Sequence, residues 1–216
     1  MSRRLIMANG SGAGNFDVGL VFYASFRNAL VAETGQQLSG NWNHVFDSNL
    51  NRHVAVSVSG SALYFPIAGL PVRNETFTMA GWLKADFNTA TLLGWGHIPF
   101  KPTDAAFCAL TNNGRESLLS MPTGYADADY SIAVPAEMNR WYHLCGTHDE
   151  ATGKNIFYVN GVKVGESIKT LTVGTDNAAL GCFWGTQAGD VSAAEVRIYN
   201  RVLSAAEAKA LAKIIR

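Results

Sequence analysis

The 216-residue sequence predicts an all-β protein, with two antiparallel sheets packed as a sandwich and one short α-helix at the C-terminal end. Short apolar runs recur along most of the chain, separated by Gly, Asn, Asp and Pro, and they show little helical periodicity. Closely spaced strands without intervening helices form antiparallel sheets, which bury a face of each by packing together. Helical spacing begins only in the last residues, so the helix is confined to the end.

The predicted strands follow one another from residue 18 to residue 199. Residues 52–58 (RHVAVSV) place valines on one face, which is typical of a strand with one buried side. Residues 76–84 (TFTMAGWLK) are largely apolar on both faces, which predicts a central strand. The other predicted strands are residues 18–26, 62–65, 91–95, 106–110, 117–120, 141–148, 155–160, 162–164, 178–184 and 194–199.

Two local patterns predict a hairpin turn and the helix. Asn160 and Gly161 separate two apolar runs, and both residue types accept the positive φ that a type I′ turn requires. Ser204 and Glu207 form a capping-box pattern, after which alanine and leucine recur at helical spacing. We therefore expect a helix over residues 204–215 that lies against the sandwich.

The chain is expected to be a single domain preceded by an arm. Residues 1–16 are rich in glycine, which predicts a flexible N-terminal arm, and residues 17–216 form the domain, including the helix. The apolar stretch behind Arg3 and Arg4 is too short for a secretory signal, and no stretch reaches the ~18 apolar residues that cross a bilayer. The sequence thus predicts cytoplasmic synthesis, with a signal removed before residue 1 as the open alternative.

The composition is rich in apolar residues and poor in charge. Hydrophobic residues make up 48% and charged residues 16%, and 17 basic side chains balance 17 acidic ones. Global disorder is excluded, because it needs low hydrophobicity and high net charge. A nucleic-acid or membrane partner is not expected, since the former needs a net positive field. Cys108, Cys145 and Cys182 match no zinc-site spacing and are expected to be small buried side chains, with one disulfide between two of them as the alternative.

Segments from most of the chain carry a family resemblance. In order they are GLVFYASF (19–26), FTMAGWLK (77–84), RWYHLCGTHD (140–149) leading into GKNIFYVNG (153–161), and EVRIYNRVLS (195–204). Together they resemble the laminin G-like, concanavalin A-like lectin/glucanase jelly-roll family. The resemblance implies two curved antiparallel sheets of roughly six or seven strands each. It implies no single function, because the fold hosts lectins, adhesion modules, glycan-binding modules and glycosidases.

Departures from the family pattern concern acidic residues. Ala194 stands where many relatives carry an acidic residue before the EVRIY stretch, and Pro66 follows the ALYF strand in place of an Asp-rich segment. Calcium needs roughly six to eight oxygen ligands, usually including several carboxylates. No cofactor is therefore expected, with calcium left open. The remaining candidate metal ligands are Asp149, Glu150 and Asp190.

The chain lacks the catalytic patterns of related enzymes. Glycosidases of this architecture carry Glu-x-Asp-x-Glu on one strand, and the most similar alternation is Asp127-Ala128-Asp129. The five histidines show neither HxH nor HExxH spacing. A non-enzymatic protein is expected.

Aromatic side chains in or beside predicted loops are the candidate ligand-binding residues. The apolar faces of sugar rings stack on aromatic rings, while Asn and Asp bind the hydroxyl groups. The alternative interpretation is that Trp82, Trp141 and Trp95 are core anchors between the sheets. The candidates are Trp95, His97, Tyr125, Tyr130 and Trp184.

These observations favour a non-catalytic recognition or assembly module that binds a glycan or a protein surface. The alternative is a phage virion structural protein, a capsid decoration or tail protein, that self-assembles or binds a capsid or tail partner through residues 1–16. A glycoside hydrolase ranks third.

Overall fold

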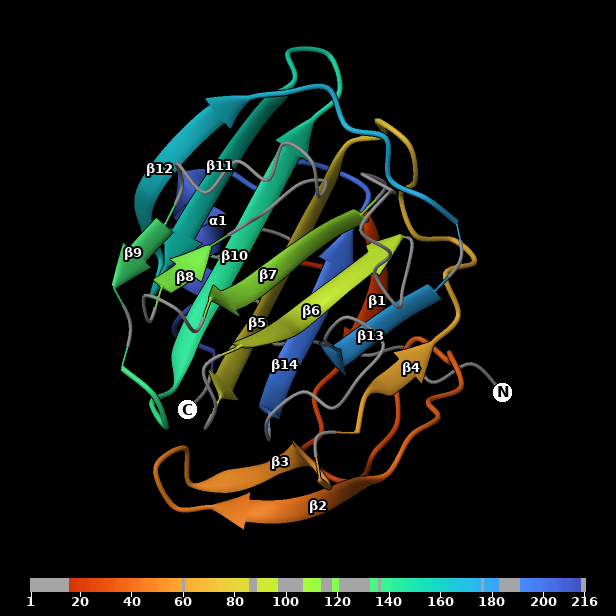
Figure 1. The fold of residues 1–216 in the computed structure, drawn as a ribbon, viewed down its shortest axis with the longest axis vertical. Helices are drawn as coiled ribbons and strands as arrows, with labels where there is room; N and C mark the ends of the chain where they lie inside the picture. The colour runs from red at the N-terminus through yellow and green to blue at the C-terminus, as the bar shows by residue number, and fades with distance from the viewer. Residues whose placement is uncertain are drawn as a thin grey trace.

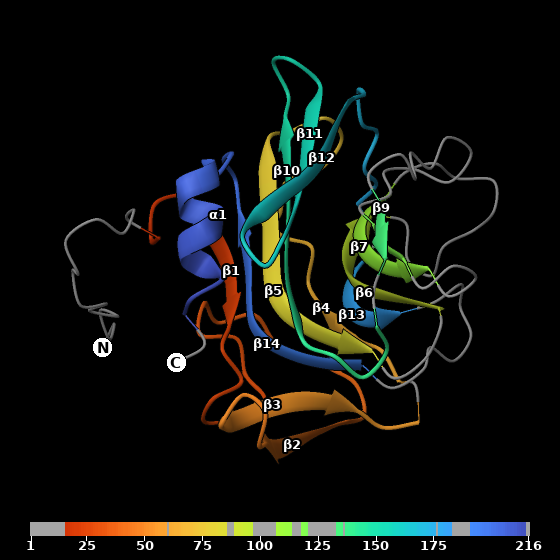
Figure 2. The same cartoon turned by 90° about the vertical axis from the view of Figure 1, so that its left-hand side faces the viewer.

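The computed structural model describes residues 16–59, 61–85, 89–96, 107–113, 118–120, 133–135, 137–175, 177–182 and 191–214. Two antiparallel sheets face each other, and a short helix lies on the outer side of the larger sheet (Figures 1 and 2). The predicted two-sheet jelly roll with one C-terminal helix is confirmed. No helix among these residues has the length and apolar character needed to cross a membrane.

The larger sheet has eight strands and contains the predicted central strand, which lies between two long neighbours and is almost entirely buried. In spatial order the strands are β12 (Val162–Ile168), β11 (Lys154–Val159), β10 (Tyr142–Asp149), β5 (Phe77–Ala85), β14 (Val191–Tyr199), β3 (Arg52–Ser57) and β2 (Trp42–Asp47), with β1 (Leu20–Ala24) also paired to β14.

β14 changes partner halfway along its length. Its first half pairs with β3 through Ser192 and Ala193, and its second half pairs with β1 from Val196 onward. Between the halves the register shifts, and Glu195 takes a positive φ of 54°. β1 and β3 therefore separate at Glu195. We call the region of Ser25, Arg52 and Glu195 the fork.

The smaller sheet has six strands. The sequence predicts neither β9 of this sheet nor the edge strand β2 of the larger sheet. β9 has three residues and contains a proline, and β2 is half polar. The order is β4 (Leu63–Phe65), β13 (Asn177–Cys182), β6 (Thr89–Gly96), β7 (Phe107–Asn113), β8 (Leu118–Ser120) and β9 (Ala133–Pro135).

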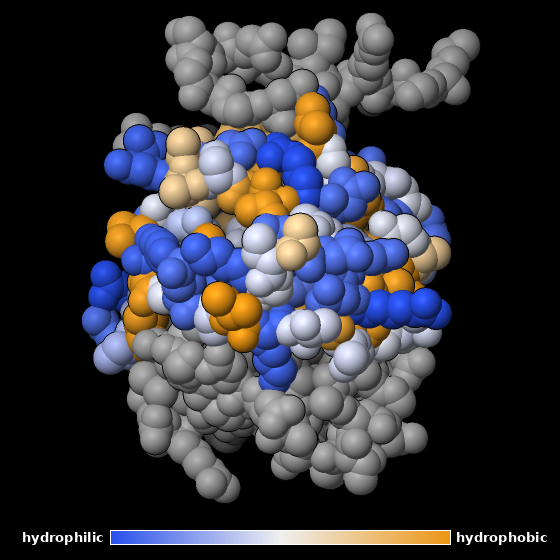
Figure 3. Space-filling view, turned by 90° about the horizontal axis from the view of Figure 1, so that it is seen from above, coloured by the Kyte–Doolittle hydropathy of each residue, from blue (hydrophilic) through white to orange (hydrophobic). Residues whose placement is uncertain are grey.

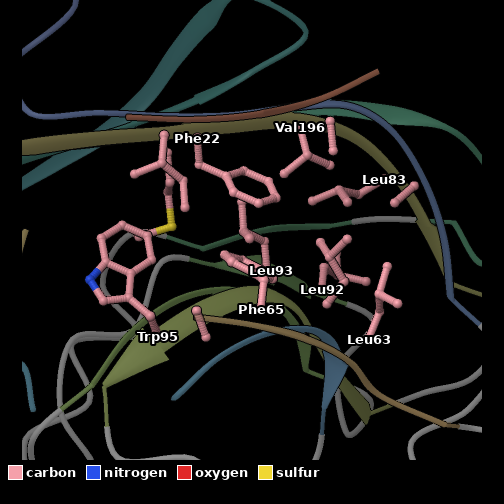
Figure 4. Packing of buried hydrophobic residues seen from close by; sticks show 14 of the residues in the cluster. Phe22, Leu63, Phe65, Leu83, Leu92, Leu93, Trp95 and Val196 are labelled. Atoms are coloured by element: carbon pink, nitrogen blue, oxygen red, sulfur yellow. The ribbon is translucent and has the colours of Figure 1, made fainter. Parts of the chain in front are cut away.

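The main core fills the space between the sheets. Phe22 of β1 stacks on Phe65 of β4 at 4.2 Å between ring centroids, which joins the two sheets directly (Figure 4). Phe77 meets Trp95 edge-on at 5.0 Å. Full burial of side chains of this size contributes about 1.5–3 kcal/mol each.

The helix α1 (Ala205–Leu211) covers a second apolar cluster on the outer face. Ser204 and Glu207 form the predicted capping box, but the helix ends at a C-cap on Ala212, earlier than predicted. Ala208 and Leu211 face the sheet. The sheet side of this cluster includes Ala80, Cys145, Tyr158 and Tyr199.

The turn between β11 and β12 has the predicted conformation and supports the helix. Asn160 and Gly161 have φ values of 51° and 77°, as a type I′ turn requires. A Cβ atom on Gly161 would lie 2.7 Å from Cα of Lys209. Glycine is needed here both for the turn and for the close approach of α1.

Candidate functional site

Trp95 is a core residue. It is the one predicted ligand-binding residue that lies within the described part of the chain. Its side chain is 0% exposed, and its indole N–H donates a hydrogen bond to the backbone oxygen of Pro71 at 2.6 Å. This corrects its assignment to a binding surface, because no face of the ring is open to a ligand. The other candidates, His97, Tyr125, Tyr130 and Trp184, lie outside the described residues.

Trp141 and Trp82, which are also expected between the sheets, pack outside the inter-sheet core. Trp141 is buried with Val54 and Ala194 in a cluster separate from the inter-sheet core, and Trp82 packs against this cluster half-buried. The expectation that they anchor the space between the sheets is therefore wrong. Ala194 and Trp82 are cross-strand partners, which places both on the outer face of the larger sheet.

Of the candidate metal ligands, Asp149 and Glu150 lie among the described residues. The carboxylate of Asp149 accepts hydrogen bonds from the backbone N–H of Ala151 at 3.1 Å and from the hydroxyl of Thr152 at 2.8 Å, which shapes the turn after β10. Glu150 is exposed, and Asp190 lies outside the described residues. Within the described ranges, no three His, Cys, Asp or Glu side chains gather as a metal site would require.

Asp47 is held as an anion at the end of β2. Its carboxylate accepts hydrogen bonds from the ammonium group of Lys84 and the indole N–H of Trp141, each at 3.0 Å. Burial raises the pKa of Asp47, but these hydrogen bonds outweigh burial and leave its pKa lowered.

Glu195 is held as an anion at the fork. Its carboxylate accepts hydrogen bonds from Arg52 at 2.5 Å, Arg197 at 2.6 Å and the hydroxyl of Tyr23 at 2.9 Å. Burial raises its pKa, and the two guanidinium groups lower it by more, so the net direction is downward. Burial raises the pKa of Tyr23 to about 12; the positive charge of Arg197 opposes this shift and the negative charge of Glu195 adds to it. The carboxyl group of Glu195 is therefore charged and the hydroxyl of Tyr23 neutral at neutral pH.

Several buried polar groups on the larger sheet lack hydrogen bonds. The buried atoms without a hydrogen-bond partner are His143 Nδ1, Trp82 Nε1, Arg197 Nε and the hydroxyl oxygen of Tyr199. Burial lowers the pKa of His143 to about 3, so its imidazole is neutral. Burial also raises the pKa of the Cys145 thiol to about 12, which keeps it from acting as a thiolate. The neutral imidazole of His143 and the neutral thiol of Cys145 are therefore not activated for nucleophilic chemistry.

Three aromatic rings lie together on the β2–β3 hairpin, at the lower edge of Figure 1. His44 and Phe46 alternate along β2 and Phe46 pairs with His53 of β3, so the three side chains share one face. The two histidine rings stack at 4.7 Å, and Phe46 meets His53 edge-on at 5.5 Å. Phe46 is 53% exposed. We call His44, Phe46 and His53 the aromatic strip.

The aromatic strip has no local signal in the sequence, because β2 is not predicted as a strand. Without β2, the two histidines are simply nine residues apart in the sequence, and this spacing matches no metal-site motif. The strip offers flat ring surfaces and imidazole nitrogens at one exposed place. Such a surface can contact the apolar face of a ligand and hydrogen-bond its polar rim. It is the candidate binding surface among the described residues.

Comparison with known proteins agrees with this architecture. The family described as the concanavalin A-like lectin/glucanases superfamily matches residues 59–209. Domain 4 of AbnA, an extracellular arabinanase from Geobacillus stearothermophilus solved with arabinotriose, is 22% identical with a TM-score of 0.70, over 90% of this chain and 98% of that one.

Two further solved structures are similar at lower identity. Trypanosoma rangeli sialidase with 2,3-difluorosialic acid is 20% identical with a TM-score of 0.68, over 91% of this chain and 34% of that one. A structure of botulinum neurotoxin type C, whose cell entry depends on two ganglioside molecules, is 11% identical with a TM-score of 0.64, over 92% of this chain and 51% of that one. No curated protein sequence matches the chain. The structural likenesses support the fold.

Proposed function

The chain belongs to the concanavalin A-like lectin/glucanase superfamily, and from this premise we propose that it is a non-catalytic recognition module that binds a glycan or a protein surface. The observation that carries the proposal is the exposed aromatic strip. Phe46 and His53 are exposed at one place and held beside His44, so the strip offers ring surfaces and imidazole nitrogens for contact with a partner.

The carboxylates support the non-catalytic part of the proposal. A glycosidase needs two carboxyl groups about 5–10 Å apart, and the general acid needs a raised pKa. Within the described ranges, every carboxyl group whose pKa clearly departs from its usual range departs downward, because each accepts hydrogen bonds from basic side chains or other donors. These groups are Asp47, Glu166, Glu195 and Glu207. None of the four is suited to donate a proton at neutral pH.

Two of the similar structures favour a glycan as partner. The arabinanase domain was solved with arabinotriose, and the neurotoxin interacts with gangliosides. Both are below 25% identity, so they guide the choice of ligands to test. The virion alternative depends on the N-terminal arm, of which residues 1–15 lie outside the described residues, and it stays a prediction.

The proposal is tested by measuring binding and hydrolysis on the same protein. The full chain is labelled and applied to a glycan array, and a panel of polysaccharides is assayed for released reducing ends. Binding without release is the expected result. Release of reducing ends would contradict the non-catalytic part, and an array without signal would contradict glycan recognition.

A further inference from the structure

We infer that the aromatic strip of His44, Phe46 and His53 is a sugar-ring binding site in which Phe46 provides the main stacking surface. The inference rests on the proposed function and deepens it, because it names the site and the chemistry of the ligand.

Phe46 is unusual among the exposed apolar residues. Seven large hydrophobic side chains are exposed among the described residues, and Phe46 is the aromatic one; the others are Val18, Val31, Val45, Met138, Val162 and Ile168. A half-exposed phenylalanine leaves much of its apolar surface in water, which is unfavourable unless a ligand covers it. Covering the ring would recover that free energy on binding.

The three rings are held in place from both sides. On the strip side, Nε2 of His44 lies 2.9 Å from the backbone oxygen of Phe26, and His53 lies between its two aromatic neighbours. On the opposite side of the hairpin, the residues next to Phe46 and His53 are tied down by ion pairs. Asp47 binds Lys84 at 3.0 Å, and Arg52 binds Glu195 at 2.5 Å. A surface fixed in this way loses little conformational freedom when a ligand binds.

The size of the strip fits a sugar better than a protein. A stable protein interface buries about 800 Å² on each partner around an apolar centre. Phe46 meets the imidazole of His53, and among the described residues its own face of the hairpin carries no other exposed large apolar side chain. At the opposite end of the molecule, seen from above in Figure 3, hydrophobic residues are likewise interspersed with hydrophilic ones. One aromatic ring matches the apolar C–H face of one sugar ring.

His53 completes the polar side of the site. Its imidazole is exposed, and its nitrogens have no hydrogen-bond partner among the described residues. An imidazole both donates and accepts hydrogen bonds, so it suits a hydroxyl group at the edge of a sugar ring stacked on Phe46. Since sugar rings carry hydroxyls around an apolar face, the combination favours a carbohydrate over a purely apolar ligand.

The test uses the full chain with arabinotriose, xylotriose, cellotriose and chitotriose as probes, and saturation-transfer NMR detects binding. For the trisaccharide that binds best, Phe46→Ala is expected to weaken affinity about tenfold, in line with loss of an aromatic stacking contact. Phe46→Tyr should retain binding. Ile168→Ala is the matched control, because Ile168 is 80% exposed on β12 at the other edge of the larger sheet. It should bind as the wild type does.

A second measurement on the wild type does not depend on the variants folding. The imidazole proton signals of His53 and His44 should shift when the trisaccharide is added, while those of buried His143 and His148 should not. Equal binding by Phe46→Ala, or shifts confined to other residues, would overturn the strip as the site and leave the proposed function intact. An array and a trisaccharide panel without any wild-type signal would overturn both the strip as a sugar site and the glycan part of the proposed function.

Discussion

Replacing Glu195 with glutamine removes the negative charge at the fork while keeping the length and shape of the side chain. The wild-type carboxylate is 3% exposed and accepts charged hydrogen bonds from Arg52 and Arg197, which are themselves 5% and 1% exposed. In Glu195→Gln both guanidinium groups would stay buried without a counter-charge. Removing one partner of a buried ion pair costs about 3–5 kcal/mol.

The remaining contacts place the expected loss at the low end of that range. Arg52 keeps its hydrogen bond to the backbone oxygen of Ser25 at 2.7 Å, and Arg197 keeps its position over the ring of Tyr23 at 4.3 Å. We therefore expect a loss of about 3 kcal/mol in the free energy of unfolding. With a urea m-value of about 2 kcal/mol/M, the unfolding midpoint should fall by about 1.5 M.

Urea unfolding followed by tryptophan fluorescence measures this midpoint. Glu166→Gln is the matched control, since Glu166 also contacts two lysines, Lys154 at 3.0 Å and Lys163 at 2.7 Å, but on the surface. Exposed ion pairs contribute about 0–1 kcal/mol, so this variant should change the midpoint little. Equal midpoints for Glu195→Gln and Glu166→Gln would refute the argument that the fork depends on a buried charge.

Three further predictions concern other groups. Stability should fall on acidification in two stages. Burial holds the folded pKa of His143 (about 3) and that of His148 below the unfolded value of about 6.5, so urea midpoints should drop from pH 6.5 downward, and His143→Gln should reduce this upper stage without changing the lower one. The folded pKa values of Glu195 and Asp47 lie below their unfolded values of about 4, so the midpoints should drop more steeply below about pH 4.5. Tyr199→Phe should leave the free energy of unfolding unchanged or raise it by up to about 1 kcal/mol, because the buried hydroxyl of Tyr199 has no hydrogen-bond partner. Thermal unfolding measures this change, and a clear loss of stability would mean that the hydroxyl does have a partner. Gly161→Ala should lower the free energy of unfolding by more than about 1 kcal/mol, because φ is 77° and the new Cβ would meet Cα of Lys209. An unchanged urea midpoint would argue against the close packing of α1 on this turn.

The sequence predicts most of the strands because their apolar residues are patterned by burial. The central strand, the Asn160-Gly161 turn and the capping box at Ser204 depend on local residues, so each is visible in a short window. β2 is different. Most of its side chains are at least partly exposed at a sheet edge, and no alternation of apolar and polar residues marks it.

The candidate site is harder to predict because it depends on contacts between distant residues. The strip exists only once β2 and β3 are paired in register, and the Glu195 network joins residues 143 positions apart. For Trp95 the sequence predicts a binding residue where the structure has a core residue. An aromatic residue near a predicted loop has the same local sequence whether it points to solvent or, as here, into the core. Glu195 itself carries no sequence signal for its positive φ.

The division of β14 between two partners has a consequence for how this scaffold can vary. Among the described residues, the β2–β3 hairpin is paired to β14 at Ser192 and Ala193, so few backbone pairs of the sheet depend on the hairpin. A hairpin joined in this way can change its exposed side chains without altering the ladder of β10, β5, β14 and β1. It is the natural place to graft a new specificity, provided that the ion pairs of Asp47 and Arg52 and the buried side chains of the hairpin are retained. These buried side chains include Trp42, Val54 and Ala55.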